Sequence, residues 1–94
     1  MNCGSIVYSD HSVIQMFKRD IATEDVSTVI NKGEIINEYL YDRPYPSYLL
    51  LGFVNMRPLH VVLAKDDKKN KCIIVTVYQP DKDLWDSSFR KKRS

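Results

Sequence analysis

Two residues in neighbouring apolar segments have the chemistry of an acid–base pair, His60 and Tyr78. His60 interrupts the strand-like run 59–64, and because an unperturbed histidine titrates near pH ~6.5 it can serve as a general acid or base. Strand alternation places His60 on one face with Val62 and Ala64. The competing interpretations are a buried histidine whose hydrogen bonds are satisfied and a tyrosine that only packs.

A second polar group is predicted near the N-terminus. His11 is followed at i+4 by Gln15 and at i+7 by Lys18, so the three side chains share one face of a helix. His11 is the third candidate catalytic residue, and Lys18 is a candidate for binding RNA. The alternative is that this line is an ordinary solvated helix face.

Further cations define candidate phosphate contacts. Arg57 lies on a turn beside the His60 strand, where it either contacts phosphate or is simply solvated. The C-terminal run attracts polyanions such as RNA, and its competing role is solubility; it consists of Arg90, Lys91, Lys92 and Arg93. Without these four, ten basic residues face 12 acidic ones, so the net charge falls from +2 to −2. We therefore expect the attraction to RNA to come mainly from this tail.

Several kinds of site lack their sequence signals. There is no glycine-rich phosphate loop, no zinc-like cluster and no serine nucleophile elbow. Cys3 and Cys72 are far apart and form no C-x-x-C pair, so we expect neither a metal site nor a disulfide. No apolar run fits a signal peptide or a membrane span, and the expected location is the cytoplasm. Any enzyme here is predicted to use no metal and no cofactor.

The length of 94 residues predicts a single domain, 1–94, with an N-terminal arm at 1–8 and a basic tail at 90–94. A first helix over about 10–19 is capped by Ser9 or Asp10. A second helix begins at Thr23 and ends before Gly33, which is expected to be a left-handed stop. The apolar stripes predicted to face the core are Val13, Ile14, Phe17 and Ile21, then Val26, Val29 and Ile30.

The apolar period then shortens, which predicts strands. They are expected at 34–41, 48–54, 59–64 and 72–78, separated by a proline loop at 42–47, a short turn and a charged hairpin at 65–71. Such short links require antiparallel pairing. The predicted fold is therefore α+β, with two N-terminal helices on one face of an antiparallel sheet of about four strands whose centre is 48–54 and 72–78. Trp85 and Phe89 are expected to pack back on the domain, with mobility from about Lys91 onward.

A series of short strings resembles the small prokaryotic domain-of-unknown-function family 4258. The strings cover about residues 11–93 and run in order: His11…Met16, Ile21-Ala-Thr-Glu-Asp-Val26, Gly33-Glu-Ile-Ile36, Arg43-Pro-Tyr-Pro-Ser47, Arg57-Pro-Leu-His-Val-Val62, Thr76-Val-Tyr78, Pro80, Trp85 and Phe89. His11, His60 and Tyr78 match the polar pattern of the family. Two positions depart from it: Gln15, where the family usually has arginine, and Asp20, where it usually has glycine.

That family resembles the RelE-like toxins, and its helix–helix–sheet order is similar to that of BrnT-type toxins. The resemblance implies a toxin that cuts messenger RNA, with a zinc-finger antitoxin of the MqsA type as its protein partner. The leading hypothesis is a metal-independent ribonuclease in which His60 acts as base or acid with Tyr78, while His11, Lys18 and Arg90 position the RNA or stabilise charge. The alternative is a non-catalytic interaction module that binds a protein partner or RNA.

Overall fold

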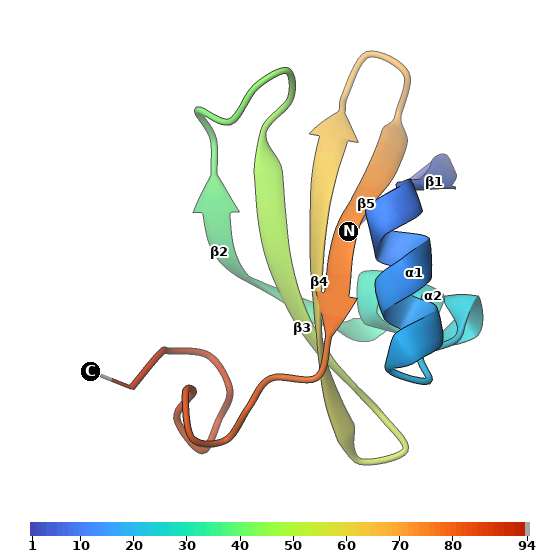
Figure 1. Ribbon diagram of the computed structural model, residues 1–94. Coiled ribbons are helices and arrows are strands. Elements are labelled where there is room, and N and C mark those ends of the chain that lie inside the picture. The colour runs from blue at the N-terminus through green and yellow to red at the C-terminus, as the bar shows by residue number, and fades with distance from the viewer. Residues whose placement is uncertain (94) are drawn as a thin grey trace.

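Two helices and a five-stranded sheet make up the computed structural model, which describes residues 1–93 (Figure 1). In chain order the elements are β1 (Ser5–Tyr8), α1 (Asp10–Lys18), α2 (Thr23–Lys32), β2 (Glu34–Tyr39), β3 (Ser47–Val54), β4 (Arg57–Asp66) and β5 (Lys71–Tyr78). The strand order in the sheet is β1-β5-β4-β3-β2. The predicted α+β class and the four predicted strands are confirmed. Neither described helix is long and apolar enough to cross a membrane.

The prediction of a purely antiparallel, roughly four-stranded sheet is wrong at one edge. Residues 1–8 do not form a free arm, because Ser5–Tyr8 is a fifth strand that pairs parallel to β5, with Ile6 opposite Cys72. The other neighbouring strands are antiparallel, as expected. A four-residue strand has too little alternation to be recognised alone. The central strand is β4, which carries His60 and lies between β3 and β5, so the predicted centre at 48–54 and 72–78 is wrong.

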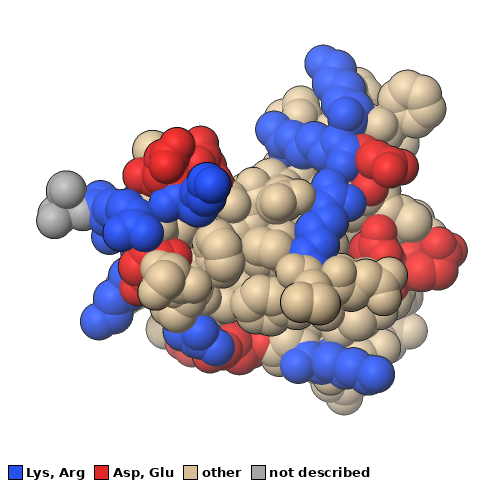
Figure 2. All heavy atoms as spheres, turned by 90° about the horizontal axis from the view of Figure 1, so that it is seen from below, with Lys and Arg blue, Asp and Glu red and all other residues tan. Residues whose placement is uncertain are grey.

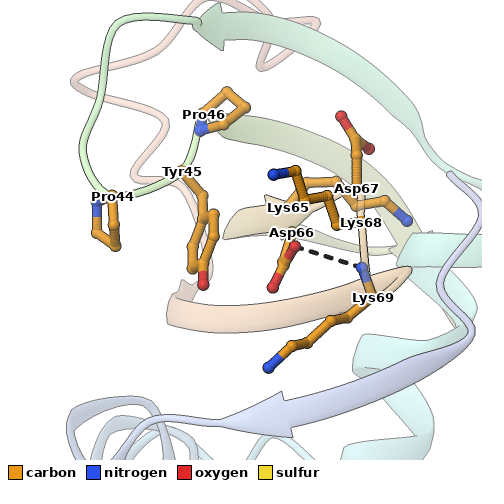
Figure 3. A pocket seen from close by; sticks show the side chains of 8 residues that line it. All are labelled: Pro44, Tyr45, Pro46, Lys65, Asp66, Asp67, Lys68 and Lys69. Carbon is orange, nitrogen blue, oxygen red and sulfur yellow. Dashed lines mark hydrogen bonds between the residues drawn. The ribbon is translucent and has the colours of Figure 1, made fainter.

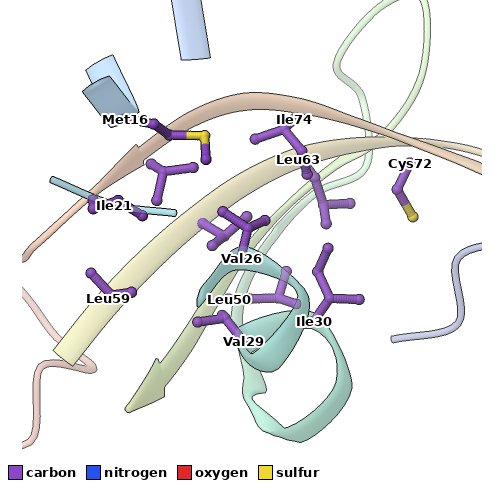
Figure 4. Close-up of a cluster of buried hydrophobic side chains, with 12 residues drawn as sticks. Met16, Ile21, Val26, Val29, Ile30, Leu50, Leu59, Leu63, Cys72 and Ile74 are labelled. Atoms are coloured by element: carbon purple, nitrogen blue, oxygen red, sulfur yellow. The ribbon is translucent and has the colours of Figure 1, made fainter. Parts of the chain in front are cut away.

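The helices cover one face of the sheet, where α1 packs on β5 and α2 packs on β3 and β4. Figure 4 shows the buried side chains that meet between these layers. Close approach of α2 depends on two glycines. A Cβ at Gly52 would lie 2.9 Å from a methyl of Val29, and one at Gly33 would lie 2.5 Å from the Leu51 carbonyl oxygen. Gly33 has an extended φ of −79°, so it ends α2 as predicted but without the predicted left-handed conformation.

The rotation of α1 about its axis differs from the prediction. Ser12 and Met16 face the core, whereas Val13, Ile14 and Phe17 are exposed. Ser12 tolerates burial because its hydroxyl donates to the Ser9 carbonyl at 2.8 Å, while the hydroxyl of Ser9 caps the helix by accepting from the Ser12 amide. The expected apolar stripe therefore lies on the surface of the molecule.

The two cysteines are joined, contrary to the prediction. Cys3, just before β1, forms a disulfide with Cys72 of β5, with Cα atoms 5.6 Å apart. Because β1 runs beside β5, the parallel pairing brings together residues that are 69 positions apart in the sequence. The contact could not be predicted from the sequence, because it depends on the pairing of β1 with β5 and β1 itself was not predicted.

The charged hairpin is shorter than predicted, because Lys65 and Asp66 belong to β4 and are buried. Lys65 donates its ammonium hydrogens to the Asn70 side chain at 2.6 Å and to the Asn2 carbonyl. These two hydrogen bonds compensate for the loss of hydration when the ammonium group is buried. Figure 3 shows Asp66 accepting from the Lys69 amide in a cavity of about 510 Å³ between the hairpin and the loop of cis-Pro44. None of the predicted catalytic residues lines this cavity.

Candidate functional site

His60 lies fully buried on the face of β4 opposite the helices, next to Tyr78 in the sheet register. Its Nδ1 is 3.1 Å from the Tyr78 hydroxyl, and its Nε2 is 2.8 Å from the Phe89 carbonyl oxygen. A carbonyl can only accept, so Nε2 carries the hydrogen of the neutral ring and donates it to Phe89. Nδ1 is then the acceptor, and Tyr78 donates its hydroxyl hydrogen to it. The two bonds fix one tautomer.

The surroundings keep this pair uncharged. The Trp85 ring meets the imidazole edge to face, with centroids 4.4 Å apart. Burial lowers the pKa of His60 below its usual value, partly offset by the hydrogen bond to Phe89. Burial also raises the pKa of Tyr78, helped by nearby Tyr39 and opposed by Arg19. At neutral pH the histidine is therefore an unprotonated base joined to a protonated phenol.

Tyr78 connects this buried pair to the surface. It lines an open cavity of about 470 Å³, which we call the Tyr78 pocket, together with Arg19, Arg57, Gln79, Asp81, Leu84 and Trp85. Two guanidinium groups beside a hydrogen-bonded phenol form an arrangement that can hold a phosphate near a proton-transfer group. Arg19 donates one bond to the Val77 carbonyl at 2.9 Å and is otherwise exposed.

Arg57 has a structural task in addition to its place in the Tyr78 pocket. Its guanidinium donates to the carbonyls of Asp20 and Arg19 and to the side chain of Gln79, at 2.7 to 2.8 Å. These bonds hold the joint between α1 and α2, where Asp20 has a left-handed φ of 54°. Of the two arginines in the pocket, Arg19 is therefore the one with more donor capacity left for a ligand.

Trp85 separates the Tyr78 pocket from a second cavity of about 460 Å³, which we call the Lys92 pocket. It is lined by Ile36, Asn37, Tyr39, Trp85, Arg90, Lys91 and Lys92. The Lys92 ammonium lies 5.9 Å from the centre of the Trp85 ring, within range of a cation–π contact. Arg90 forms an ion pair with Glu34 of β2, which holds the pKa of that carboxyl below its usual value. Three cations thus gather beside two aromatic rings.

The described part of the basic run, residues 90–93, is hydrogen-bonded to the turns that precede it and does not extend away from the domain. The Arg93 amide donates to the Leu84 carbonyl at 2.8 Å, and the Asp86 amide donates to the Lys91 carbonyl at 2.8 Å. A β-bridge joins Trp85 to Lys92. The last residue of the predicted 90–94 tail, Ser94, lies outside the described residues.

The predicted anchoring of the C-terminal segment by two aromatic residues is confirmed. Trp85 is buried against His60, and Phe89 packs edge to face on Phe53 with centroids 6.5 Å apart. The segment forms turns rather than a helix. It therefore forms part of the wall of both pockets.

The structure does not bring His11 or Lys18 to this site. Both are exposed on α1, which packs on the face of the sheet opposite His60. Figure 2 shows basic side chains at the C-terminal edge interspersed with acidic ones and separated by uncharged surface from those on the right of the view. The described residues contain no cluster of acidic, histidine or cysteine side chains that could hold a metal ion.

Sequence reasoning found His60, Tyr78, Arg57 and the C-terminal cations but missed Arg19 and Tyr39. Arg19 directly follows Lys18 at the end of α1, and its role depends on how the helix joint packs on β5. Tyr39 ends the edge strand β2, which is not a neighbour of β5, so its proximity to Tyr78 does not follow from strand pairing. The only signal that could have identified Arg19 was a positive charge at the end of the predicted helix.

Comparison with protein-family models, curated proteins and solved structures assigns the chain to a family. No curated protein and no solved structure matches this chain. A family model described as "Domain of unknown function (DUF4258)" matches residues 8–79, which includes both helices, His60 and Tyr78. The match ends before Trp85 and is shorter than the span of about 11–93 expected from the sequence strings. Because the model covers well over half of the chain, this protein belongs to the DUF4258 family.

Proposed function

We propose that this protein is a metal-independent ribonuclease that acts on messenger RNA, as the toxin of a toxin–antitoxin pair. The observation that carries the proposal is the position of Tyr78, which lines a pocket with Arg19 and Arg57 while its hydroxyl donates to His60. Cleavage of RNA without a metal needs a base for the ribose 2′-hydroxyl and cations for the developing charge on phosphorus. This pocket offers both.

The proton path runs through Tyr78, because His60 is buried and does not reach substrate itself. The Tyr78 oxygen accepts the proton of the 2′-hydroxyl while its own proton moves to Nδ1 of His60. The resulting imidazolium keeps its second N–H on the Phe89 carbonyl, which stabilises it. The 2′-oxygen then attacks phosphorus as the bond from phosphorus to the 5′-oxygen breaks, with Arg19 and Arg57 next to the phosphate. The leaving 5′-oxygen takes a proton from water, and the imidazolium returns its proton through Tyr78 to the hydroxide that is left. His60 is thus a positioning residue and proton store, and Tyr78 is the catalytic residue.

The Lys92 pocket supplies the binding surface for the rest of the strand. Single-stranded RNA is typically held by cations along its backbone and by aromatic rings on which bases stack. Lys91 and Lys92 provide the charge there, and Trp85 and Tyr39 provide the rings. Arg90 is already paired with Glu34, so its share of phosphate binding is smaller than the sequence suggested.

The partner and location follow from the same proposal. The resemblance to RelE-like toxins implies a zinc-finger antitoxin as the protein partner, and messenger RNA as substrate implies the cytoplasm. Reducing conditions there keep most cysteine pairs as thiols, so the Cys3–Cys72 bond is expected to open in that compartment.

The test replaces the phenol of Tyr78. The Tyr78→Phe variant keeps the ring but loses the hydroxyl between substrate and His60, so RNA cleavage should fall by about 10² or more while RNA binding stays the same. The matched control is Tyr48→Phe, since Tyr48 packs against the core on the helix side. Growth arrest after induced expression should follow cleavage. Normal cleavage by Tyr78→Phe would remove this mechanism.

The binding surface is tested separately. Replacing Lys91 and Lys92 by glutamine should weaken binding to every RNA sequence and lower the slope of log K against log salt by about 0.7 for each phosphate that is no longer neutralised. Replacing Lys68 and Lys69 at the hairpin tip, far along the chain from this pocket, is the control with the same change of charge. An equal effect in both variants would mean that only net charge matters.

A non-catalytic module that binds a protein partner or RNA is the second candidate. The observation in its favour is that both ring nitrogens of the buried His60 already have partners, so a structural role accounts for the residue completely. Under this alternative the parent protein binds RNA or a protein without cleaving RNA, and its expression does not arrest growth.

A further inference from the structure

The apolar face of α1 has no covering element. Phe17 is 89% exposed, and Val13 and Ile14 are each 52% exposed, so three large apolar side chains project from one helix of nine residues. Their spacing of three and four residues puts them in one stripe. The stripe continues into an apolar hollow of about 290 Å³ whose lining includes Tyr8, Met16 and Ile21. Grouped exposure of this kind marks an interaction surface more often than scattered apolar residues do.

The charges at the two ends of the stripe are opposite. Asp10, in the first turn of α1, lies on the same face as Ile14 and Phe17, at i+4 and i+7. Lys18, in the last turn, lies beside Ile14 and next to Phe17. Both charged side chains are exposed, and neither forms an ion pair within the described residues. The face is therefore acidic, then apolar, then basic along its length.

We propose that this face binds the same face of a second copy of the chain, with the two α1 helices antiparallel about a two-fold axis near Ile14. In that arrangement Asp10 of each copy meets Lys18 of the other, and the opposed helix dipoles also attract. Phe17 of each copy packs against Ile14 of the other. A surface with an acid at one end and a base at the other is complementary to itself only in this orientation.

The contact is small, which sets its strength. Nine helical residues span only about 13 Å, and interfaces below the standard size are weak or transient. We expect a weak, reversible association rather than a permanent dimer. The dimer contact does not include His60, because α1 and His60 lie on opposite sides of the sheet. This inference does not depend on the proposed ribonuclease activity.

Sedimentation equilibrium of the full chain, from low micromolar to millimolar concentration, tests the proposal. The expected result is a reversible monomer–dimer equilibrium. Phe17→Ser should raise the dissociation constant about tenfold or more, since central aromatic residues dominate such contacts. A chain that stays monomeric throughout, including one whose α1 face instead binds a different protein, would overturn the inference. A dimer indifferent to Phe17→Ser would overturn it as well.

Exchanging the charges gives the sharper test of orientation. Asp10→Lys and Lys18→Asp should each weaken the dimer by several-fold, whereas the double variant should restore it, because each pair is re-formed with reversed sign. Glu38→Lys makes the same change of charge in β2, three strands away from β5 on which α1 packs, and should leave dimerisation unchanged. Thermal unfolding of each variant checks that the monomer remains folded. A double variant no better than the single ones would rule out the antiparallel pairing.

Discussion

The two ends of the chain are attached to the sheet by different means. Residues 1–8 attach through the backbone of β1 and a covalent bond from Cys3 to Cys72, which is buried in the core. Residues 85–93 attach through the side chain of His60, which packs against Trp85 and donates a hydrogen bond to the Phe89 carbonyl. One end is held by a bond that responds to redox state, and the other is held by a group that can gain a proton.

The difference indicates which end is suited to change during function. Opening β1 exposes an edge of the sheet next to the core, whereas opening residues 85–93 uncovers His60 and takes away a shared wall of both pockets. The N-terminal attachment therefore governs stability of the whole domain. The C-terminal attachment governs the candidate site and costs less to release, because less of the core depends on it.

The largest expected effect comes from breaking the N-terminal attachment. A disulfide that closes a loop of 69 residues stabilises the native state by about 4 kcal/mol, chiefly by restricting the unfolded chain. Cys3→Ser should lower the free energy of unfolding by roughly that amount while leaving Cys72 as a buried thiol, which packs well. Urea denaturation monitored by far-ultraviolet circular dichroism measures the change.

The parent protein under reductant should match Cys3→Ser, and reductant should have no effect on the variant. Trp85 emission in the native baseline should be the same for both, because that residue belongs to the other end. Equal stability of the parent with and without reductant would show that the covalent bond adds nothing to the pairing of β1.

A smaller and more local effect is expected at the C-terminal attachment. His60→Ala leaves a cavity beside Trp85 and removes the donor to the Phe89 carbonyl, which together should cost about 3 kcal/mol. Unlike Cys3→Ser, this variant should shift Trp85 emission toward that of exposed indole before global unfolding. His11→Ala, at the exposed histidine, is the control and should change neither quantity. An unshifted emission in His60→Ala would mean that residues 85–93 stay in place without the histidine.

Sequence patterns predicted the parts of the fold that depend on residues close together in the sequence. The two helices, the four long strands and the turns between them follow from caps, apolar period and prolines. β1 and its disulfide did not, because a strand of four residues becomes identifiable only through the partner that it pairs with. The rotation of α1 about its own axis also depends on the part of the sheet that the helix packs against. Helix α1 has apolar residues on two sides. The smaller side can be buried because the hydroxyl of Ser12 donates a hydrogen bond to the Ser9 carbonyl within the same helix turn.

The candidate site was predicted where it lies on adjacent strands and missed where it depends on elements that are not neighbours in the sheet. His60 and Tyr78 occupy facing positions in β4 and β5, so their proximity follows from pairing alone. Arg19 and Tyr39 reach the same region from a helix end and an edge strand, which sequence spacing does not specify. His11 satisfied a pattern of residue types, but the helix that carries it covers the other face.

The smallest expected effect is a pH dependence of stability that acts on the C-terminal attachment and not on the N-terminal one. Burial lowers the pKa of His60 in the folded protein. Below about pH 6.5 the unfolded chain therefore binds a proton at this residue, whereas the folded protein binds it only at lower pH. Stability is therefore full above that pH and falls as the pH drops toward the folded pKa, by at most about 1.4 kcal/mol per unit. Protonation also removes the acceptor for the Tyr78 hydroxyl, since Nδ1 then carries a hydrogen.

Acid titration at constant ionic strength should thus loosen residues 85–93, reported by Trp85 emission, while the disulfide keeps β1 paired. The carboxyl of Asp86 has its pKa lowered by hydrogen bonding to Ser88, so its contribution disappears only at more acidic pH and falls in a separate window. In His60→Gln the decline in stability just below pH 6.5 should be absent, because glutamine does not titrate. A parent protein whose stability and emission are flat from neutral pH down to the carboxyl range would show that His60 titrates alike in both states. The C-terminal attachment would then be as insensitive to protons as the N-terminal one.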